Sequence, residues 1–279
     1  MKNDPQNRIT SLFAVALCSD CNQLFHRKKI LTRYCNCAKM RMERNNVVAI
    51  QSRNKKAPRV ATSGGFRLIP YKNQRFPQAD ILGVDSSPEM IRAAAQAHPE
   101  MRFQLCDAGT ELGTLDRDFD VVFSNACIQW IPNHPKLLRE MMQLLRPGGI
   151  LAVQIPINQK EPIHQIIQAL AAGEKWKAHF PSPRIFYQLT VSEYYDLLGE
   201  ITDSFELWET VYMHAMLSHD AIMEWYRGTG LRPYLAALTP ELQQEFEKDV
   251  LDGVKQAYPV QKDGSVIFPF PRLFFLGER

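Results

Sequence analysis

The chain of 279 residues has no apolar run long enough to cross a membrane. An apolar stretch near its start, Leu12–Leu17, is too short to span a bilayer. No small-residue cleavage pattern follows it directly, so a secretory signal is not expected either. Because nothing in the sequence indicates secretion or a membrane span, we expect a cytoplasmic protein that does not act at a membrane.

Acidic residues are scarce in the first third of the chain. Residues 1–74 contain 15 lysines and arginines against 3 acidic residues, a net charge of +12. Residues 75–279 contain 18 against 27, a net charge of −9, so the overall charge of +3 conceals two unlike parts. The basic part also lacks sustained helical or strand periodicity. We therefore predict that residues 1–72 are an aberrant basic segment without fixed structure.

Cysteines are few, and four of the six lie in this basic segment, at Cys18, Cys21, Cys35 and Cys37. Two thiol pairs can bind zinc, and the neighbouring Arg27–Lys29 would then contact phosphates. However, the second pair has only one intervening residue, and neither pair carries the usual glycine-bearing turn. A basic tail is the favoured alternative, so we expect neither a metal site nor a nucleic-acid partner. Cys106 and Cys127 fall in or beside apolar strands, which predicts buried free thiols.

The most informative stretch is Ile81–Met90, which is typical of a short apolar strand followed by a capped helix. Ser86 or Ser87 can accept hydrogen bonds from the first helical turn, and Pro88 suits the first helical position. Asp85 ends the strand. A carboxylate at the C-terminal end of a strand in an α/β sheet can bind both hydroxyls of a nucleotide ribose. Asp85 is therefore the first candidate binding residue, and a solvated turn acid is the alternative.

Two further predicted strands end in polar residues, at Asp107 and at Asn125. Residues 135–145 then place apolar side chains on one face at helical spacing. Arg146–Gly149 is expected to stop that helix, and Ile150–Ile155 to form the next strand. This alternation predicts an α/β fold with a doubly wound, mostly parallel sheet. The three polar strand ends lie where ligands bind in such sheets.

Several motifs together resemble class I S-adenosylmethionine-dependent methyltransferases, and most closely the trans-aconitate 2-methyltransferases. The motifs lie at Asp85–Met90, Ser124–Trp130, Leu145–Gly149, Gly228–Pro233 and Phe268–Phe274. The likeness covers residues 73–279, which we predict to be a Rossmann-like methyltransferase domain. Helical cap insertions are expected at about 158–198 and 218–256, and we expect them to close over the substrate.

The resemblance implies S-adenosylmethionine as the methyl donor. The implied donor-binding residues are Asp85, Ser86, Met90, Asp107, Ala108, Asn125 and Ala126. In this family the acid at Asp85 holds the ribose, the residues around Asp107 border the adenine, and those at Asn125 line the methionine end.

The resemblance also implies methyl transfer to a carboxylate of a small polycarboxylic acid of the trans-aconitate type, giving a methyl ester. No general base is expected, because a carboxylate is already ionised at neutral pH. The bidentate fork of arginine suits the remaining carboxylates, with Arg232 as the leading candidate and Arg272 and Arg184 next. Trp130 would separate the donor from solvent. The alternatives are that Arg232 is a surface arginine without a binding role and that Trp130 is part of the core. We expect a monomer.

The glycine-rich turn that follows the first strand in this family is missing. That turn lets the backbone approach the donor without an obstructing Cβ. Here its place is taken by Thr62–Pro70, which contains a single glycine pair. Codons shifted by one base from Ala61 onward permit a closer match to the family motif, so we hypothesise that residues before about Lys72 are read out of frame. The first strand would then be missing or non-native, with Asn46–Ile50 as a weak substitute.

Two classes of function follow. The first is a small-molecule carboxyl O-methyltransferase, with another small-molecule acceptor as a variant of it. The second is a non-catalytic remnant that keeps the sheet and the cap but has lost donor binding together with its glycine-rich turn.

Overall fold

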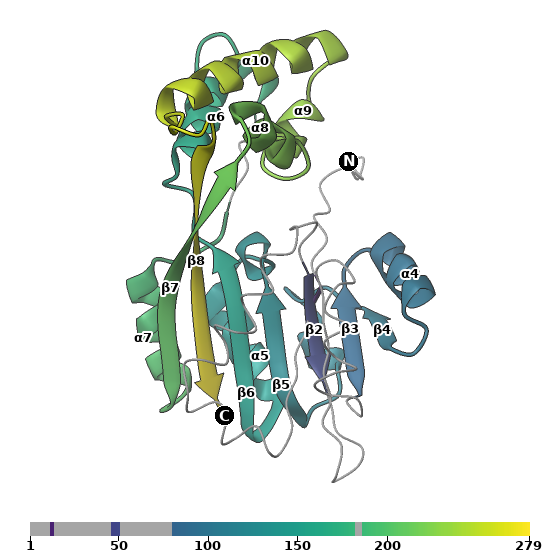
Figure 1. The fold of residues 1–279 in the computed structure, drawn as a ribbon. Coiled ribbons are helices and arrows are strands. Elements are labelled where there is room, and N and C mark those ends of the chain that lie inside the picture. The colour runs from purple at the N-terminus through teal and green to yellow at the C-terminus, as the bar shows by residue number, and fades with distance from the viewer. Residues whose placement is uncertain (1–11, 14–45, 51–79, 182–185) are drawn as a thin grey trace. The chain divides into compact units, whose positions relative to one another are not determined.

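The computed structural model describes residues 12–13, 46–50, 80–181 and 186–279 (Figure 1). The four cysteines of the basic segment, the glycine pair of Thr62–Pro70 and Arg184 lie outside the described residues. What the sequence predicts for them therefore stays a prediction. Among the helices of the described ranges, none combines the length and the apolar character that a membrane crossing requires.

The described strands form an eight-stranded sheet with the order β4-β3-β1-β2-β5-β6-β8-β7. The strands are β1 (Leu12–Phe13), β2 (Asn46–Ile50), β3 (Ile81–Asp85), β4 (Arg102–Leu105), β5 (Phe119–Asn125), β6 (Leu145–Pro156), β7 (Phe205–Met216) and β8 (Val266–Glu278). β3 pairs in parallel with β4, and β5 pairs in parallel with β6. Figure 1 shows β8 running opposite to its neighbour β6. The predicted α/β fold is confirmed.

β2 occupies the place between β3 and β5 where the first strand is expected. It runs antiparallel to β3 and to β5, with Val47 opposite Val84 and Asn46 opposite Asn125, and pairs in parallel with the two-residue strand β1. The pairing predicted for Asn46–Ile50 is therefore present. Because β2 is antiparallel, its C-terminal end lies beside the start of β3. β2 therefore ends beside the N-terminal end of β3, opposite to the strand ends where ligands bind in such sheets.

Local sequence accounts for the helices that follow β3 and β5. α4 (Pro88–Ala97) begins where the Ser87 hydroxyl accepts a hydrogen bond from the N–H of Met90, with Pro88 at its first position. α5 (His134–Leu144) buries the apolar face that the spacing predicts. Its buried apolar residues are Leu137, Leu138, Met141, Met142 and Leu144. α7 (Val191–Ile201) begins with a capping box made by Thr190 and Glu193.

The strand predicted at Ile150–Ile155 begins earlier than expected. β6 starts at Leu145, so Arg146–Gly149 lies inside the strand rather than before it. Gly148 adopts a left-handed backbone conformation with φ of 73°, and the pairing of β6 with β5 shifts in register nearby. The prediction that the helix stops here is confirmed, and the predicted start of the strand is wrong. A local irregularity of this kind admits residues that a regular strand would exclude.

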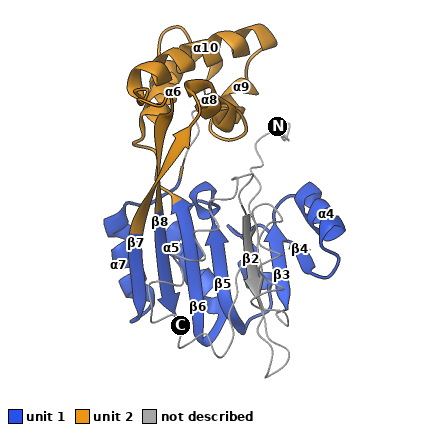
Figure 2. Cartoon of the chain, viewed as in Figure 1, with its two compact units in different colours: residues 1–155, 187–208, 273–279 blue, residues 156–186, 209–272 orange. Residues whose placement is uncertain are grey.

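The chain divides into two compact units (Figure 2). Unit 1 comprises Met1–Ile155, Tyr187–Trp208 and Leu273–Arg279, and unit 2 comprises Pro156–Phe186 and Glu209–Arg272. Both segments of unit 2 overlap the predicted cap insertions, but their bounds differ. α7, which falls within the insertion predicted at 158–198, lies in unit 1.

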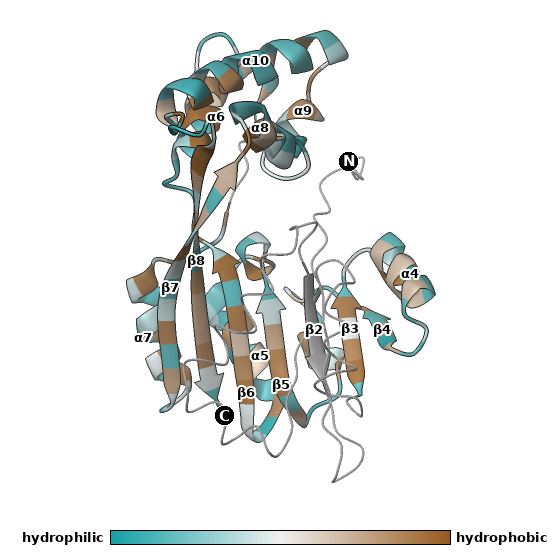
Figure 3. Ribbon diagram, in the orientation of Figure 1, coloured by the Kyte–Doolittle hydropathy of each residue, from teal (hydrophilic) through white to brown (hydrophobic). Residues whose placement is uncertain are grey.

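Unit 2 contains α6 (Pro162–Ala172), α8 (His219–Arg227), α9 (Arg232–Leu235) and α10 (Pro240–Ala257). α10 buries Phe246, Val250 and Val254, which recur every four residues along one face. Figure 3 shows polar and apolar residues alternating along α10 accordingly. Helical amphipathicity therefore gives this unit its core.

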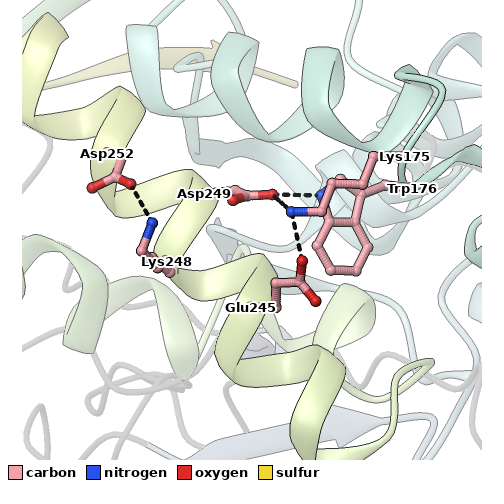
Figure 4. A network of polar contacts seen from close by, with 6 residues as sticks. All are labelled: Lys175, Trp176, Glu245, Lys248, Asp249 and Asp252. Atoms are coloured by element: carbon pink, nitrogen blue, oxygen red, sulfur yellow. Dashed lines mark hydrogen bonds and ion pairs between the residues drawn. The ribbon is translucent and has the colours of Figure 1, made fainter.

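A polar network fixes the segment after α6 to α10 (Figure 4). Lys175 Nζ lies 2.6 Å from an Asp249 carboxylate oxygen and 2.8 Å from a Glu245 carboxylate oxygen. The buried Trp176 donates its indole N–H to the same Asp249 oxygen at 2.8 Å. Burial alone would raise the pKa of Asp249, but the hydrogen bonds from Lys175 and Trp176 outweigh it and the pKa is lowered. Asp249 therefore links a surface lysine to a core aromatic ring.

Candidate active site

Asp85 is the buried carboxylate at the C-terminal end of β3. The strand Ile81–Asp85 is buried along its whole length, and Asp85 itself is 0% exposed. Its Oδ1 accepts a hydrogen bond from the N–H of Ser87 at 2.7 Å. Its Oδ2 is also buried and has no hydrogen-bond partner within the described part of the chain. A buried carboxylate oxygen normally accepts a hydrogen bond, and the hydroxyl group of a bound ligand would supply one here.

Burial raises the pKa of Asp85 to about 7, and the hydrogen bond from the Ser87 N–H opposes this rise only in part. Asp85 therefore changes its charge in the neutral range, far from the ordinary range of an aspartate. A carboxylate with a perturbed pKa at a strand end is typical of a functional site.

The turn after β3 resolves the choice between the two serines. Ser87 is the helix cap, because its Oγ accepts from the N–H of Met90 at 3.3 Å and donates to a Glu89 carboxylate oxygen at 2.8 Å. Ser86 and Met90 are half-buried on either side of that cap. Both lie within the same turn as Asp85, as the sequence predicts, although Ser86 does not act as the cap.

The loop after β4 lies directly beside Asp85. β3 and β4 are in register at Asp85 and Leu105, and the Cys106 N–H donates to the Asp85 carbonyl oxygen at 2.9 Å. Asp107 is exposed and accepts from the N–H of Gly109 at 2.8 Å. The next residue, Ala108, is buried. The structure therefore brings the predicted adenine-bordering pair next to the predicted ribose-binding acid.

β5 ends at Asn125, which is half-buried and pairs with Gln154 on β6. The following residue, Ala126, has a left-handed φ of 50° and donates its N–H to the Gln154 carbonyl oxygen at 2.8 Å. A non-glycine residue in this conformation costs about 1–2 kcal/mol, and such strain is often found at functional sites. Trp130 is half-buried at the end of the short 3₁₀ helix η5 (Ile128–Trp130).

Some buried polar side chains near the end of β5 were given no role from the sequence, although Ser124 and Gln129 lie within the motif Ser124–Trp130. Ser124 and Gln129 are at most 1% exposed. Neither the Ser124 hydroxyl oxygen nor Gln129 Oε1 has a hydrogen-bond partner among the residues described. Gln154 is also buried, within an otherwise apolar strand. For Gln154, the available signal in the sequence was a polar residue within an apolar strand. Only the structure shows that these polar side chains are buried.

His134, the first residue of α5, is a further buried polar residue that the sequence analysis did not identify. It is 1% exposed, and its ring bonds to the Tyr194 hydroxyl and to the Ile128 carbonyl oxygen. Its side-chain partner lies 60 residues away in the sequence, so no local spacing could have revealed it.

The predicted substrate arginines lie in different surroundings within unit 2. Arg272 on β8 is 4% exposed, and its guanidinium carbon lies 4.8 Å from the Phe270 ring centroid and 5.8 Å from that of Tyr212. Arg232 is exposed at the start of α9. Cys106 and Cys127 in unit 1 are buried free thiols, as predicted.

Comparisons with known proteins agree on one kind of enzyme. A family profile described as "Methyltransferase domain" matches residues 59–153. The chain is 39% identical over 209 residues to a trans-aconitate 2-methyltransferase from Methylobacterium radiotolerans, covering 74% of this chain and 80% of that protein. It is 41% identical over 207 residues to the enzyme of the same name from an Azoarcus species, with the same coverage of 74% and 80%. A third, from Escherichia coli, is 39% identical over 207 residues.

Proposed function

Because the chain belongs to the trans-aconitate 2-methyltransferase family, we propose that it methylates a carboxylate oxygen of a small polycarboxylic acid of the trans-aconitate type, giving a methyl ester. Its methyl donor is S-adenosylmethionine, as in other methyltransferases of this class. The observation that supports this proposal best is the buried Asp85 carboxylate, whose Oδ2 has no hydrogen-bond partner among the residues that the structure describes.

The surroundings of Asp85 fit the ribose of the donor. The Ser87 N–H occupies Oδ1 and fixes the carboxylate in the turn, which leaves Oδ2 for a ribose hydroxyl. The carboxylate can accept hydrogen bonds from two neighbouring hydroxyls when it is ionised, which a single neutral side chain cannot do as strongly. We assign Ser86, Met90, Asp107 and Ala108 to the adenosine side of the site. We assign Asn125 and Ala126 to the methionine side.

When bound, the donor supplies an already electrophilic methyl group on sulfur. This chain therefore needs to hold the acceptor in line with the methyl group and to keep water from the acceptor's carboxylate. It does not need to take up or release a proton in the reaction. No general base is proposed, because a carboxylate acceptor is already ionised at neutral pH. Trp130 is proposed to exclude water at the methionine side.

We assign the remaining carboxylates of the acceptor to Arg272, with Arg232 and Arg184 as further candidates. The Arg272 guanidinium packs against the aromatic rings of Phe270 and Tyr212, which restrains its position. A restrained guanidinium loses less entropy when it binds a carboxylate. Replacing Arg272 with glutamine should raise the KM for the acceptor about tenfold or more and leave donor affinity unchanged. Arg227→Gln, in which an exposed arginine of unit 2 loses its ion pair with Glu247, is the matched control.

A second candidate function, a remnant that does not bind the donor, is favoured by one observation. β2 runs antiparallel in the place of the first strand, so its C-terminal residue, Ile50, pairs with Ile81 and lies away from the strand ends that carry Asp85 and Asn125. A backbone cradle for the carboxylate of the donor would then be missing.

Calorimetric titration of the full chain with S-adenosylmethionine separates the two functions. Micromolar binding supports the enzyme, and no binding supports the remnant. Incubation with S-adenosylmethionine and trans-aconitate, followed by mass spectrometry, then tests for a methyl ester. Formation of product only with an acceptor that lacks carboxylates would refute the proposed acceptor class.

The two buried free thiols also support the expected cytoplasmic location. A monomer that does not bind nucleic acid stays a prediction.

A further inference from the structure

Asn125, assigned above, ends β5, and the connection from β5 to α5 carries two more of the assigned residues, Ala126 and Trp130. Within it, η5 forms a single tight turn, in which the Trp130 N–H donates to the Cys127 carbonyl oxygen at 3.0 Å and the Ile131 N–H donates to the Ile128 carbonyl oxygen at 2.9 Å. A turn of this length has few internal hydrogen bonds, so its position depends on contacts from other elements.

His134 supplies one such contact from the first position of α5. Its Nε2 lies 2.8 Å from the Ile128 carbonyl oxygen. A carbonyl oxygen can only accept, so Nε2 carries the proton and donates it. Nδ1 is then the acceptor of the neutral ring, and it lies 2.6 Å from the Tyr194 hydroxyl. The Tyr194 hydroxyl must therefore donate to it.

Burial keeps both partners in these protonation states. It lowers the pKa of His134, and backbone hydrogen bonds to Ile128 and Ile131 oppose this only in part, so the ring is neutral near pH 7. Burial raises the pKa of Tyr194, so its hydroxyl keeps its proton. A backbone hydrogen bond to Leu189 favours the ionised oxygen of Tyr194, as expected if the Leu189 N–H donates to it. The bonds thus run in one direction, from Tyr194 through His134 to the Ile128 carbonyl oxygen.

A second link joins the same two segments. The Tyr187 N–H donates to the Gln129 carbonyl oxygen at 3.0 Å, within the η5 turn. The residues that lead into α7 and the first turn of that helix therefore hold η5 at two adjacent carbonyl groups. Tyr194 is 0% exposed and also packs on Phe275 of β8, with ring centroids 5.4 Å apart. The anchor is thus part of the core of unit 1 and has little freedom to move.

We propose that His134 and Tyr194 are positioning residues that hold the Ile128–Trp130 turn, and with it Asn125, Ala126 and Trp130, in the arrangement needed for donor binding. This inference rests on the proposed function. Neither residue is proposed to touch the donor or the acceptor, and both act through the backbone of the turn.

Tyr194→Phe tests the proposal with the loss of a single hydroxyl group. We expect the amide hydrogens of Trp130 and Ile131 to exchange about tenfold faster than in the unmodified chain, because the turn loses its anchor. We also expect the dissociation constant of S-adenosylhomocysteine, the unreactive product, to rise about fivefold or more. Tyr258→Phe is the matched control, since the Tyr258 hydroxyl is also buried and accepts from the Ile163 N–H at 3.2 Å, but in unit 2.

His134 offers a rescue that a purely structural role would not show. His134→Leu removes the hydrogen bonds to the Tyr194 hydroxyl and to the Ile128 carbonyl oxygen, whereas His134→Gln keeps a side-chain N–H for the Ile128 carbonyl oxygen. We expect His134→Gln to exchange more slowly and bind more tightly than His134→Leu. Should His134→Leu fail to fold, Tyr194→Phe decides the question alone.

The outcomes separate this inference from the proposed function. Exchange at Trp130 and Ile131 no faster in Tyr194→Phe than in Tyr258→Phe would overturn the positioning role. Faster exchange with unchanged affinity in a chain that binds the donor would overturn it as well. If the unmodified chain binds no donor, the proposed function fails, while the exchange rates still decide whether the pair holds the turn.

Discussion

Replacing Asp85 with asparagine should change donor binding and protein stability in opposite directions. The substitution keeps the size of the side chain and removes the charge that Asp85 acquires above its pKa of about 7. The Ser87 N–H can still donate to the amide oxygen at the position of Oδ1. The amide nitrogen, however, cannot accept from a ribose hydroxyl at the position of Oδ2.

The expected loss of affinity follows from hydrogen bonds to a charged acceptor, which are worth about 1.5–3 kcal/mol each. Loss of one such bond and weakening of the second, together about 3 kcal/mol, corresponds to roughly a 100-fold rise in Kd at pH 8. Since the donor needs the ionised form, affinity in the unmodified chain should rise with pH through about 7 and then level off. Affinity in Asp85→Asn should not depend on pH over this range.

Stability without donor should respond in the opposite sense. The pKa of Asp85 is raised in the folded state above its value of 3.8 in an unfolded chain. Its contribution to stability is therefore full below pH 3.8 and is lost as the pH rises through about 7. A shift of this size corresponds to about 4 kcal/mol once the carboxylate is ionised. Asp85→Asn should thus melt at a higher temperature than the unmodified chain at pH 8, with a much smaller difference at pH 5.

Calorimetric titration with S-adenosylhomocysteine and thermal melts at pH 5, 7 and 8 measure both effects. Asp80→Asn is the control for a lost charge, because Asp80 directly precedes β3, away from Asp85, and pairs with Arg102 at 3.2 Å. Unchanged donor affinity in Asp85→Asn, or a melting difference that does not vary with pH, would refute the role assigned to this carboxylate.

Three other perturbations test the fold. A frame-corrected chain should melt at a higher temperature than the unmodified chain and shift further upward with S-adenosylmethionine; equal melts and equal shifts would show that the N-terminal segment is genuine. Gly149→Ala should destabilise the protein by about 1–3 kcal/mol in urea unfolding. The reason is that a Cβ at this position would lie 2.8 Å from a backbone carbonyl oxygen. Gly113→Ala is the control and should change stability little, because a Cβ there would meet open space. Trp176→Phe should lower the free energy of unfolding by about 2 kcal/mol in the same assay. The substitution shrinks a ring that is 2% exposed and removes its hydrogen bond to Asp249. A loss of stability too small to measure would contradict the role of the network.

Local chemistry was enough to predict the elements around the first candidate residue. The apolar run Ile81–Val84, the acid at Asp85 and the serine and proline that follow it all act within a few residues of one another, and the structure forms the strand, turn and helix that they predict. The apolar face of α5 was predictable for the same reason, because helical spacing places neighbouring turns on one side. The start of β6 was not, since a register shift in the pairing with β5 admits Arg146–Gly149 into the strand.

Only the tertiary structure could decide the features that depend on distant segments and on burial. The sequence identified Asp85, but its environment follows from the strands and turn packed around it. Among the described residues, one of its carboxylate oxygens is buried without a hydrogen-bond partner, and burial raises its pKa to about 7. His134 had no partner in the sequence because Tyr194 lies on another helix, 60 residues further along the chain. The antiparallel direction of β2 likewise follows from pairing with strands that come much later in the chain. Sequence pattern reports which faces are apolar over a few turns, whereas the partner of a buried polar group is set by the folded chain as a whole.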